Sequence, residues 1–185
     1  FIVAYVVNTG YNIIMSMNSF DKFFNRFFPV PSFLAAPSFG LDISDESLKF
    51  IELVNTKNGI RVGRHGERNI PPGIIESGKI KNSKRIEEIL MSLKAEVGLK
   101  SVRVSLPEEQ VYLFKLRLEK SGLVSIRESI ELSLEEHIPI QASEAIFDYE
   151  LLNQDAQNLE LQVAAIPQNV IESYLSIFKH AQIGV

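Results

Sequence analysis

The sequence has 185 residues, of which 45% are hydrophobic and 23% charged, and its net charge is −4, a profile typical of a globular chain that buries a sizeable core. A mildly acidic chain without a basic stripe lacks the attraction for phosphate backbones that nucleic-acid binding needs, so we expect no nucleic-acid partner. The absence of cysteine excludes disulfides, thiolate metal sites and cysteine nucleophiles.

Residues 1–38 form a predicted N-terminal extension. The apolar stretch 1–15 is interrupted by polar residues and lacks the basic leader of a signal peptide and the length of a membrane span. It is interpreted as translated upstream sequence or as a genuine extension. Five phenylalanines then share one helical face: Phe20, Phe23, Phe24, Phe27 and Phe28. This face either docks on the protein body or binds a membrane surface or partner, unless it stays disordered. A proline-rich linker, 29–37, follows.

Two strands joined by a polar turn are predicted at 39–53. Phe39, Leu41 and Ile43 alternate with small or acidic residues, turn formers occupy 44–47, and an apolar run then resumes. Asp42 ends the first strand at this hairpin, where a carboxylate is costly to bury without a partner. It is therefore either a site residue or a structural turn cap.

A third strand at 60–66, a helix at 83–97 that ends at Gly98, and a strand at 102–106 are predicted next. Together they form a sheet layered with helices. The spacing from Gly73 to Gly78 and Lys79 mimics a phosphate-binding P-loop. However, position 80 is Ile, which offers no hydroxyl for magnesium, and a double proline precedes the loop. A P-loop is therefore excluded.

The pattern from 107 to 166 changes to strand, helix, strand, strand. Its helix starts with a capping-box spacing from Ser125 to Glu128. We expect the helix to cover one sheet face: Tyr112, Phe114, Leu116, Leu118, Phe147, Tyr149, Leu151, Leu161 and Val163. The opposite face carries Lys115 and Arg117, expected to pair with Asp148 and Glu150, and five apolar residues without an obvious cover: Val111, Leu113, Ile146, Leu152 and Ile166. They dock on the main domain or bind a partner.

A last helix is predicted at 168–182. Five of its residues are expected to face inward: Val170, Ile171, Tyr174, Leu175 and Phe178.

The chain from Phe39 onward resembles the PilM family of actin-like proteins of type IV pilus assembly. The resemblance rests on the order hydrophobic-Gly-hydrophobic-Asp, polar turn, Lys at 39–49, and on segments 70–80, 102–107, 126–140 and 161–167. It implies an α/β (α+β) fold, the first half of an actin-like ATPase (ribonuclease H-like) domain at 39–106 and 167–185. A strand-helix-strand-strand subdomain is inserted at 107–166.

The resemblance also implies a cofactor, ATP with Mg²⁺. Its phosphates would lie at Asp42, Ser44, Asp45, Ser47 and Lys49, with Asp42 organising a hydrated Mg²⁺ and the remaining site residues outside this chain. Ser44 replaces a glycine usual in the family, and Asp45 adds negative charge beside the phosphates. The expected activity is ATP binding with weak or no hydrolysis.

The implied function is a cytoplasmic scaffold, peripheral to the inner membrane, for pilus or related secretion assembly. It would bind the cytoplasmic peptide of a PilN-like inner-membrane partner through Val111, Leu113, Ile146, Leu152 and Ile166, and self-association stays open. The alternatives are a division protein similar to FtsA, or a kinase or ATPase of the same superfamily.

Overall fold

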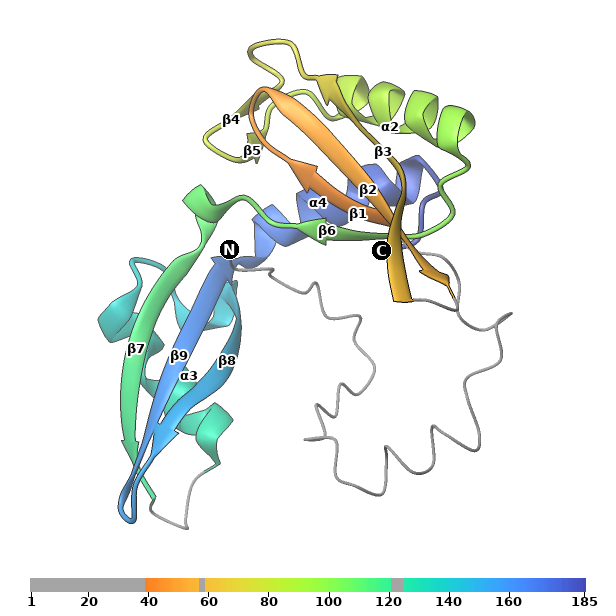
Figure 1. Cartoon of the computed structure of the whole chain (residues 1–185). Helices are drawn as coiled ribbons and strands as arrows, with labels where there is room; N and C mark the ends of the chain where they lie inside the picture. Colours follow the sequence, from red (N-terminus) through yellow and green to blue (C-terminus); the bar gives the residue numbers. More distant parts are fainter. Residues whose placement is uncertain (1–38, 57–58, 121–124) are drawn as a thin grey trace.

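The computed structural model describes residues 39–56, 59–120 and 125–185, which build two larger β-sheets with separate hydrophobic cores and one short two-stranded sheet (Figure 1). We call residues 39–106 and 168–185 the large unit, and residues 107–167 the small unit. The predicted extension 1–38, including the Phe20–Phe28 helix, lies outside the described residues. Within those residues, every helix is too short or too polar to cross a membrane.

A four-stranded sheet organises the large unit. Its strands are β1 (Phe39–Ile43), β2 (Ser47–Thr56), β3 (Gly59–Asn69) and β6 (Val102–Ser105), in the order β3-β2-β1-β6. β1 pairs antiparallel with β2 and parallel with β6. The predicted hairpin and third strand are thus confirmed. The segment that mimics a P-loop forms a separate short hairpin of β4 (Ile75–Glu76) and β5 (Lys79–Ile80).

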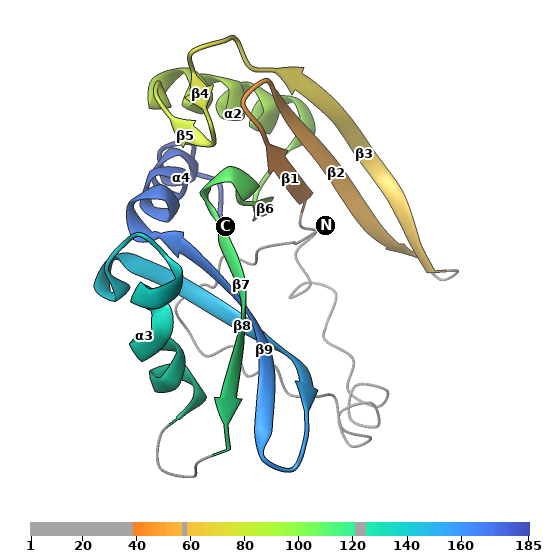
Figure 2. The ribbon, with the colours of Figure 1, turned by 90° about the vertical axis from the view of Figure 1, so that its left-hand side faces the viewer.

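Two helices cover one face of this sheet: α2 (Ser83–Val97) and α4 (Gln168–His180) (Figure 2). The Asn82 side chain caps the start of α2, and Gly98 ends it at a φ of 68°, where glycine adds no Cβ strain. On α4, Val170, Ile171, Tyr174 and Phe178 are buried as predicted. The prediction for Leu175 is wrong, since this side chain is 39% exposed. Ile177 is fully buried in its place, because the buried face of α4 includes the side that packs against α2.

The small unit is a three-stranded antiparallel sheet with one helix. Its elements are the 3-10 turns η1 (Glu108–Gln110) and η2 (Ala142–Glu144), the helix α3 (Ile126–His137), and the strands β7 (Tyr112–Glu119), β8 (Ala145–Gln154) and β9 (Asn158–Pro167). Both arms of the predicted capping box are present, since the side chains of Ser125 and Glu128 each accept the other's backbone N–H. α3 buries Ile130 and Leu134 against Leu161 and Val163.

Tyr149 and Leu151 lie opposite Val163 and Leu161, on the sheet face predicted for them, but α3 leaves them 37% and 46% exposed on the edge strand β8. The predicted charge pairs are wrong because the strand order is β7-β9-β8. β9 separates the charges expected to pair across strands. Lys115 instead lies 3.8 Å from the carboxylate of Glu160, and Arg117 lies 3.7 Å from that of Asp155.

Candidate functional sites

The first candidate site lies at the end of β1. Asp42 is exposed, and its carboxylate accepts a hydrogen bond from the Ser105 hydroxyl on β6. Lys49 is exposed too and lies directly opposite Asp42 in the β1–β2 ladder. Opposite residues share one face of a sheet, so the acidic side chain of Asp42 and the basic side chain of Lys49 project from the same face.

This pair has the chemistry to hold a metal with an anionic ligand. Among residues 39–56, 59–120 and 125–185, no cluster of three or more acidic, histidine or cysteine side chains could enclose a metal ion. Asp42 would therefore hold Mg²⁺ largely through bound water, which Mg²⁺ retains readily. Lys49 provides a point charge for a phosphate. The Asp42–Lys49 pair thus fits part of a Mg²⁺-nucleotide site.

The two turn serines are already engaged with each other. The Ser44 hydroxyl donates to the Ser47 carbonyl over 3.1 Å and accepts the Ser47 N–H over 3.2 Å, and the Ser44 N–H donates to the same carbonyl at 2.9 Å. Ser47 is only 8% exposed. The predicted phosphate contacts of Ser44 and Ser47 would therefore require this turn to open.

Asp45 has a different set of partners from those predicted. Its carboxylate accepts the N–H of Ser77 at 2.6 Å and the N–H of Gly78 at 2.9 Å, both in the turn between β4 and β5. Both carboxylate oxygens are bound there. Asp45 was predicted to contact phosphate. Because its hydrogen bonds direct its carboxylate toward the β4–β5 turn, we now assign it to holding that turn.

The ion pair between Glu52 and Arg64 was not predicted. The guanidinium donates to both Glu52 oxygens at 2.8 Å, the Arg64 N–H donates at 3.1 Å, and a further donation reaches the Val97 carbonyl at the end of α2. The hydrogen bonds from Arg64 lower the pKa of Glu52 to about 2 and those to Glu52 raise the pKa of Arg64. A Cβ at Gly63 would lie 2.7 Å from the Glu52 carboxylate. A glycine inside a strand, which often marks a bulge, is the one available signal.

The second candidate site is the sheet face of the small unit that is opposite α3, which we call the open face. The structure divides its five apolar residues. Ile166 is 6% exposed and packs in the core of the large unit, and Val111 packs against the same core. Leu113, Ile146 and Leu152 are 47%, 42% and 45% exposed. The candidate surface is therefore narrowed to these three residues.

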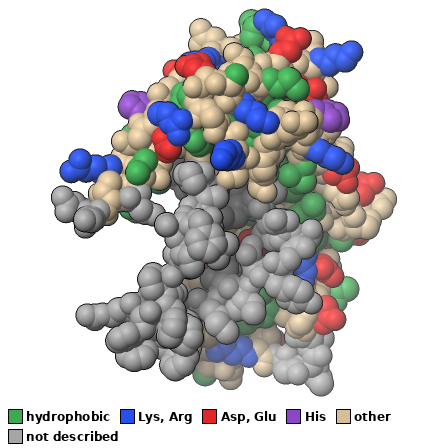
Figure 3. Space-filling view, turned by 90° about the vertical axis from the view of Figure 1, so that its right-hand side faces the viewer, with side chains coloured by type: hydrophobic (Ala, Val, Ile, Leu, Met, Phe, Trp, Pro, Cys, Tyr) green, Lys and Arg blue, Asp and Glu red, His purple; other side chains and the backbone are tan. Residues whose placement is uncertain are grey.

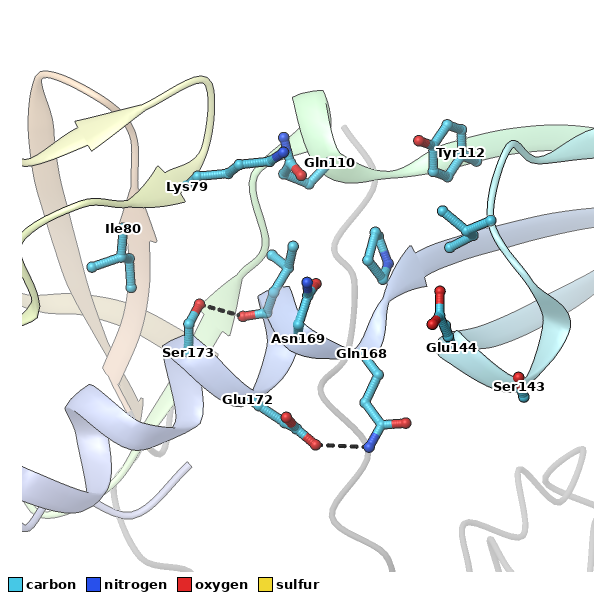
Figure 4. Close-up of a pocket in the computed structure, with 13 residues that line it drawn as sticks. Lys79, Ile80, Gln110, Tyr112, Ser143, Glu144, Gln168, Asn169, Glu172 and Ser173 are labelled. Atoms are coloured by element: carbon cyan, nitrogen blue, oxygen red, sulfur yellow. Dashed lines mark hydrogen bonds between the residues drawn. The ribbon is translucent and has the colours of Figure 1, made fainter.

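A groove of about 620 Å³ separates the two units on the α3 side (Figure 4). The residues that line it include Lys79, Gln110, Tyr112, Glu144, Asn169 and Glu172. Tyr112 is adjacent to Leu113 in sequence and points to the other side of the sheet. The groove and the open face are therefore separate surfaces.

Positive charge is dispersed on the face shown in Figure 3. Lys and Arg side chains, in blue, are scattered over the large unit and several adjoin Asp or Glu side chains, in red. The ion pairs of the large unit include Arg68 with Glu96 and Arg85 with Glu88. Among the described residues visible on this face, the Lys and Arg side chains form no concentrated basic patch of the kind that binds nucleic acid.

Comparisons with known proteins give consistent results. Residues 40–185 match the family described as type IV pilus assembly protein PilM. The fold is similar to a solved structure titled "PilM-PilN type IV pilus biogenesis complex", with a TM-score of 0.71 and 22% identity over 80% of this chain and 46% of that one. It is also similar to the cytoplasmic domain of EpsL, an inner-membrane component of the Vibrio cholerae type II secretion system, with a TM-score of 0.52 and 12% identity over 80% of this chain and 54% of that one.

Among curated proteins, no relative matches the sequence. This chain spans about half the length of the two solved chains that it resembles. The structural match confirms the predicted α/β fold, which combines a layered four-stranded sheet with a strand-helix-strand-strand unit.

Proposed function

The chain belongs to the family of the type IV pilus assembly protein PilM, and from this premise we propose that it is an ATP-binding, actin-like scaffold at the cytoplasmic face of the inner membrane. The family match carries the proposal. In this proposal, residues 107–166 are an inserted subdomain that binds a PilN-like inner-membrane partner. ATP binding sets the shape of the protein, and hydrolysis is slow or absent.

Asp42 and Lys49 are the residues that we assign to Mg-ATP. The proposal is supported by their exposure and by their opposite positions in the β1–β2 ladder. Asp42 orients water molecules around Mg²⁺, and Lys49 offsets phosphate charge. Ser44 and Ser47 hold the hairpin closed until the ligand arrives. The other contacts to the nucleotide lie outside this chain, so the chain alone binds Mg-ATP weakly or not at all.

Equilibrium titration of the complete protein with a fluorescent ATP analogue tests this assignment. Asp42→Ala and Lys49→Ala are each expected to weaken binding by tenfold or more, because each removes a charged contact worth about 1.5–3 kcal/mol. Asp148→Ala and Lys84→Ala are the matched controls, since both side chains are exposed and lie outside the hairpin. Unchanged affinity in both hairpin variants would refute the assignment.

The open face is the surface that we assign to the partner. The solved relative is a complex of PilM with PilN, and we transfer that pairing to this chain as a proposal. Leu113 and Ile146 lie in adjacent rows at one end of the open face, and Leu152 lies at the other end of β8, beyond Asp148 and Glu150. A short extended peptide with an apolar side chain over Leu113 and Ile146 and charged residues opposite the charged rows would fit this surface.

Calorimetry of the complete protein with the cytoplasmic tail of the inner-membrane partner tests this surface. Leu113→Asp is expected to abolish or strongly weaken binding, because it places a charge within an apolar contact. Leu132→Asp is the control, since Leu132 is 80% exposed on α3, away from the open face. Wild-type affinity in a folded Leu113→Asp variant would exclude the open face as the binding surface.

A further inference from the structure

The turn between β4 and β5 is held by side chains from three distant segments. Its dipeptide, Ser77–Gly78, has positive φ at both residues, 49° and 73°. Asp45 accepts both N–H groups of the dipeptide. Its carbonyls are bound as well: Gln110 donates to that of Ser77 at 2.8 Å, and the Tyr174 hydroxyl donates to that of Gly78 at 3.1 Å. Each backbone N–H and C=O of the dipeptide therefore has a side-chain partner.

These partners come from functionally distinct parts of the fold. Asp45 belongs to the turn of the β1–β2 hairpin, three residues after Asp42. Gln110 lies in η1, at the crossing from the large unit into β7, and Tyr174 lies on α4, which follows the return crossing from β9. Figure 1 shows β4 and β5 between the β1–β2 turn and the segment that leads to β7. The dipeptide thus contacts the candidate nucleotide hairpin, the first crossing, and the helix that follows the second crossing.

The packing around the dipeptide leaves little room for independent movement. A Cβ added at Gly78 would lie 2.6 Å from the Cβ of Pro107, the first residue of the crossing. Tyr174 is 2% exposed, and burial raises its pKa, so it remains a neutral hydrogen-bond donor. A shift of the hairpin that displaced Asp45 would remove both N–H contacts of this turn. The change would then reach Pro107, Gln110 and Tyr174 through direct contact.

We propose that the Ser77–Gly78 turn is a mechanical link between the β1–β2 hairpin and the small unit, with Asp45, Gln110 and Tyr174 as its positioning residues. Through it, a ligand at Asp42 and Lys49 changes the orientation of the small unit and its open face. The identity of the ligand as Mg-ATP rests on the proposed function, whereas the link itself rests on the contacts described above. The small unit would have two orientations, and a ligand changes their relative populations only if it binds one of them more tightly. Breaking the link should therefore remove the effect of Mg-ATP on the orientation and leave the Mg-ATP site itself in place.

Hydrogen exchange of the complete protein without nucleotide tests the link. Asp45→Asn replaces one acceptor oxygen with a donor that faces an N–H group. We expect exchange at 77–78 to accelerate by about tenfold or more, and exchange in the first crossing, 108–111, and in the first half of α4, 168–174, to accelerate with it. The control is Glu46→Gln, which removes the same charge from an exposed neighbour in the hairpin. Acceleration confined to 77–78 would overturn the proposal.

A distance measurement tests the coupling to ligand. These 185 residues contain no cysteine, so, once any cysteine outside them is replaced by serine, Lys84→Cys on α2 and Leu132→Cys on α3 introduce one pair of exposed spin-label sites. Mg-ATP is expected to shift the distance distribution in the complete protein, and Gln110→Ala with Tyr174→Phe is expected to abolish that shift.

Three results of this measurement are informative. A shift that survives in the double variant overturns the link, and so does the absence of any shift in wild-type protein that binds Mg-ATP in the titration. If the titration detects no binding, the proposed function fails, and the hydrogen-exchange experiment alone then decides the link.

Discussion

The two hydrophobic cores should respond separately to mutation, and Leu134→Ala provides the clearest test. Leu134 is fully buried between α3 and the sheet of the small unit. The substitution removes three carbon atoms, a loss of about 2.4 kcal/mol at ~0.8 kcal/mol per buried group. The cavity that remains adds to this, because surrounding side chains relax only in part, so the total is about 3–4 kcal/mol.

Native-state hydrogen exchange resolves this loss by position. The free energy of opening should fall by about 3–4 kcal/mol for slow amides in α3, β7 and β9. In α2 and β1, whose residues belong to the other core, it should remain near the wild-type value. Leu90→Ala is the matched variant, since Leu90 is fully buried on α2, and it should give the reverse pattern. Equal losses in both units after either substitution would show that the cores unfold as one and would refute this reasoning.

Further predictions concern individual contacts. Glu52 has a pKa of about 2 against an ordinary 4.5, so its stabilising effect is complete above pH 4.5 and is lost as the pH falls toward 2; acid unfolding of Glu52→Gln should show less pH dependence in that window. Burial raises the pKa of Tyr174 above its ordinary 10, so stability should fall above pH 10 in wild-type protein and less in Tyr174→Phe, as measured by alkaline denaturation. Ser125→Ala should cost about 1 kcal/mol in urea unfolding through loss of the N-cap, and Ser125→Asp should retain most of it. Removal of residues 1–28 should reduce co-sedimentation with liposomes if the Phe20–Phe28 face binds membrane; equal sedimentation would exclude that role.

Local signals predicted most of the secondary structure correctly. The bounds of α2 agree with the prediction because a polar cap and a terminal glycine mark both of its ends. The capping box at Ser125 and the hairpin that contains Asp42 are equally local patterns. Each depends on residues within a few positions of one another, so a single sequence contains the necessary information.

Local sequence patterns could not predict the features that depend on strand order or on residues distant in sequence. Lys115 pairs with Glu160 because β9 lies between β7 and β8, an order that alternation along each strand does not encode. The role of Asp45 depends on Ser77 and Gly78, more than thirty residues away. The sequence pattern marks Glu52 only as a strand residue, and its ion pair with Arg64 forms because a bulge brings the two side chains together. In each case, tertiary contact decides what a polar side chain does.

The position of α4 after the small unit has a consequence for how the chain folds during synthesis. The large core includes Tyr174, Ile177 and Phe178, so it remains incomplete until α4 leaves the ribosome, whereas the small unit is continuous in sequence and is finished earlier. Once folded, the small unit holds Tyr112 opposite Ala165, which brings the two crossings together. Folding of the small unit has then already closed the long loop between β6 and α4, so α4 can pack without that further loss of chain entropy. We therefore expect the folded small unit to place α4 beside the sheet of the large unit and so to speed the completion of the large core.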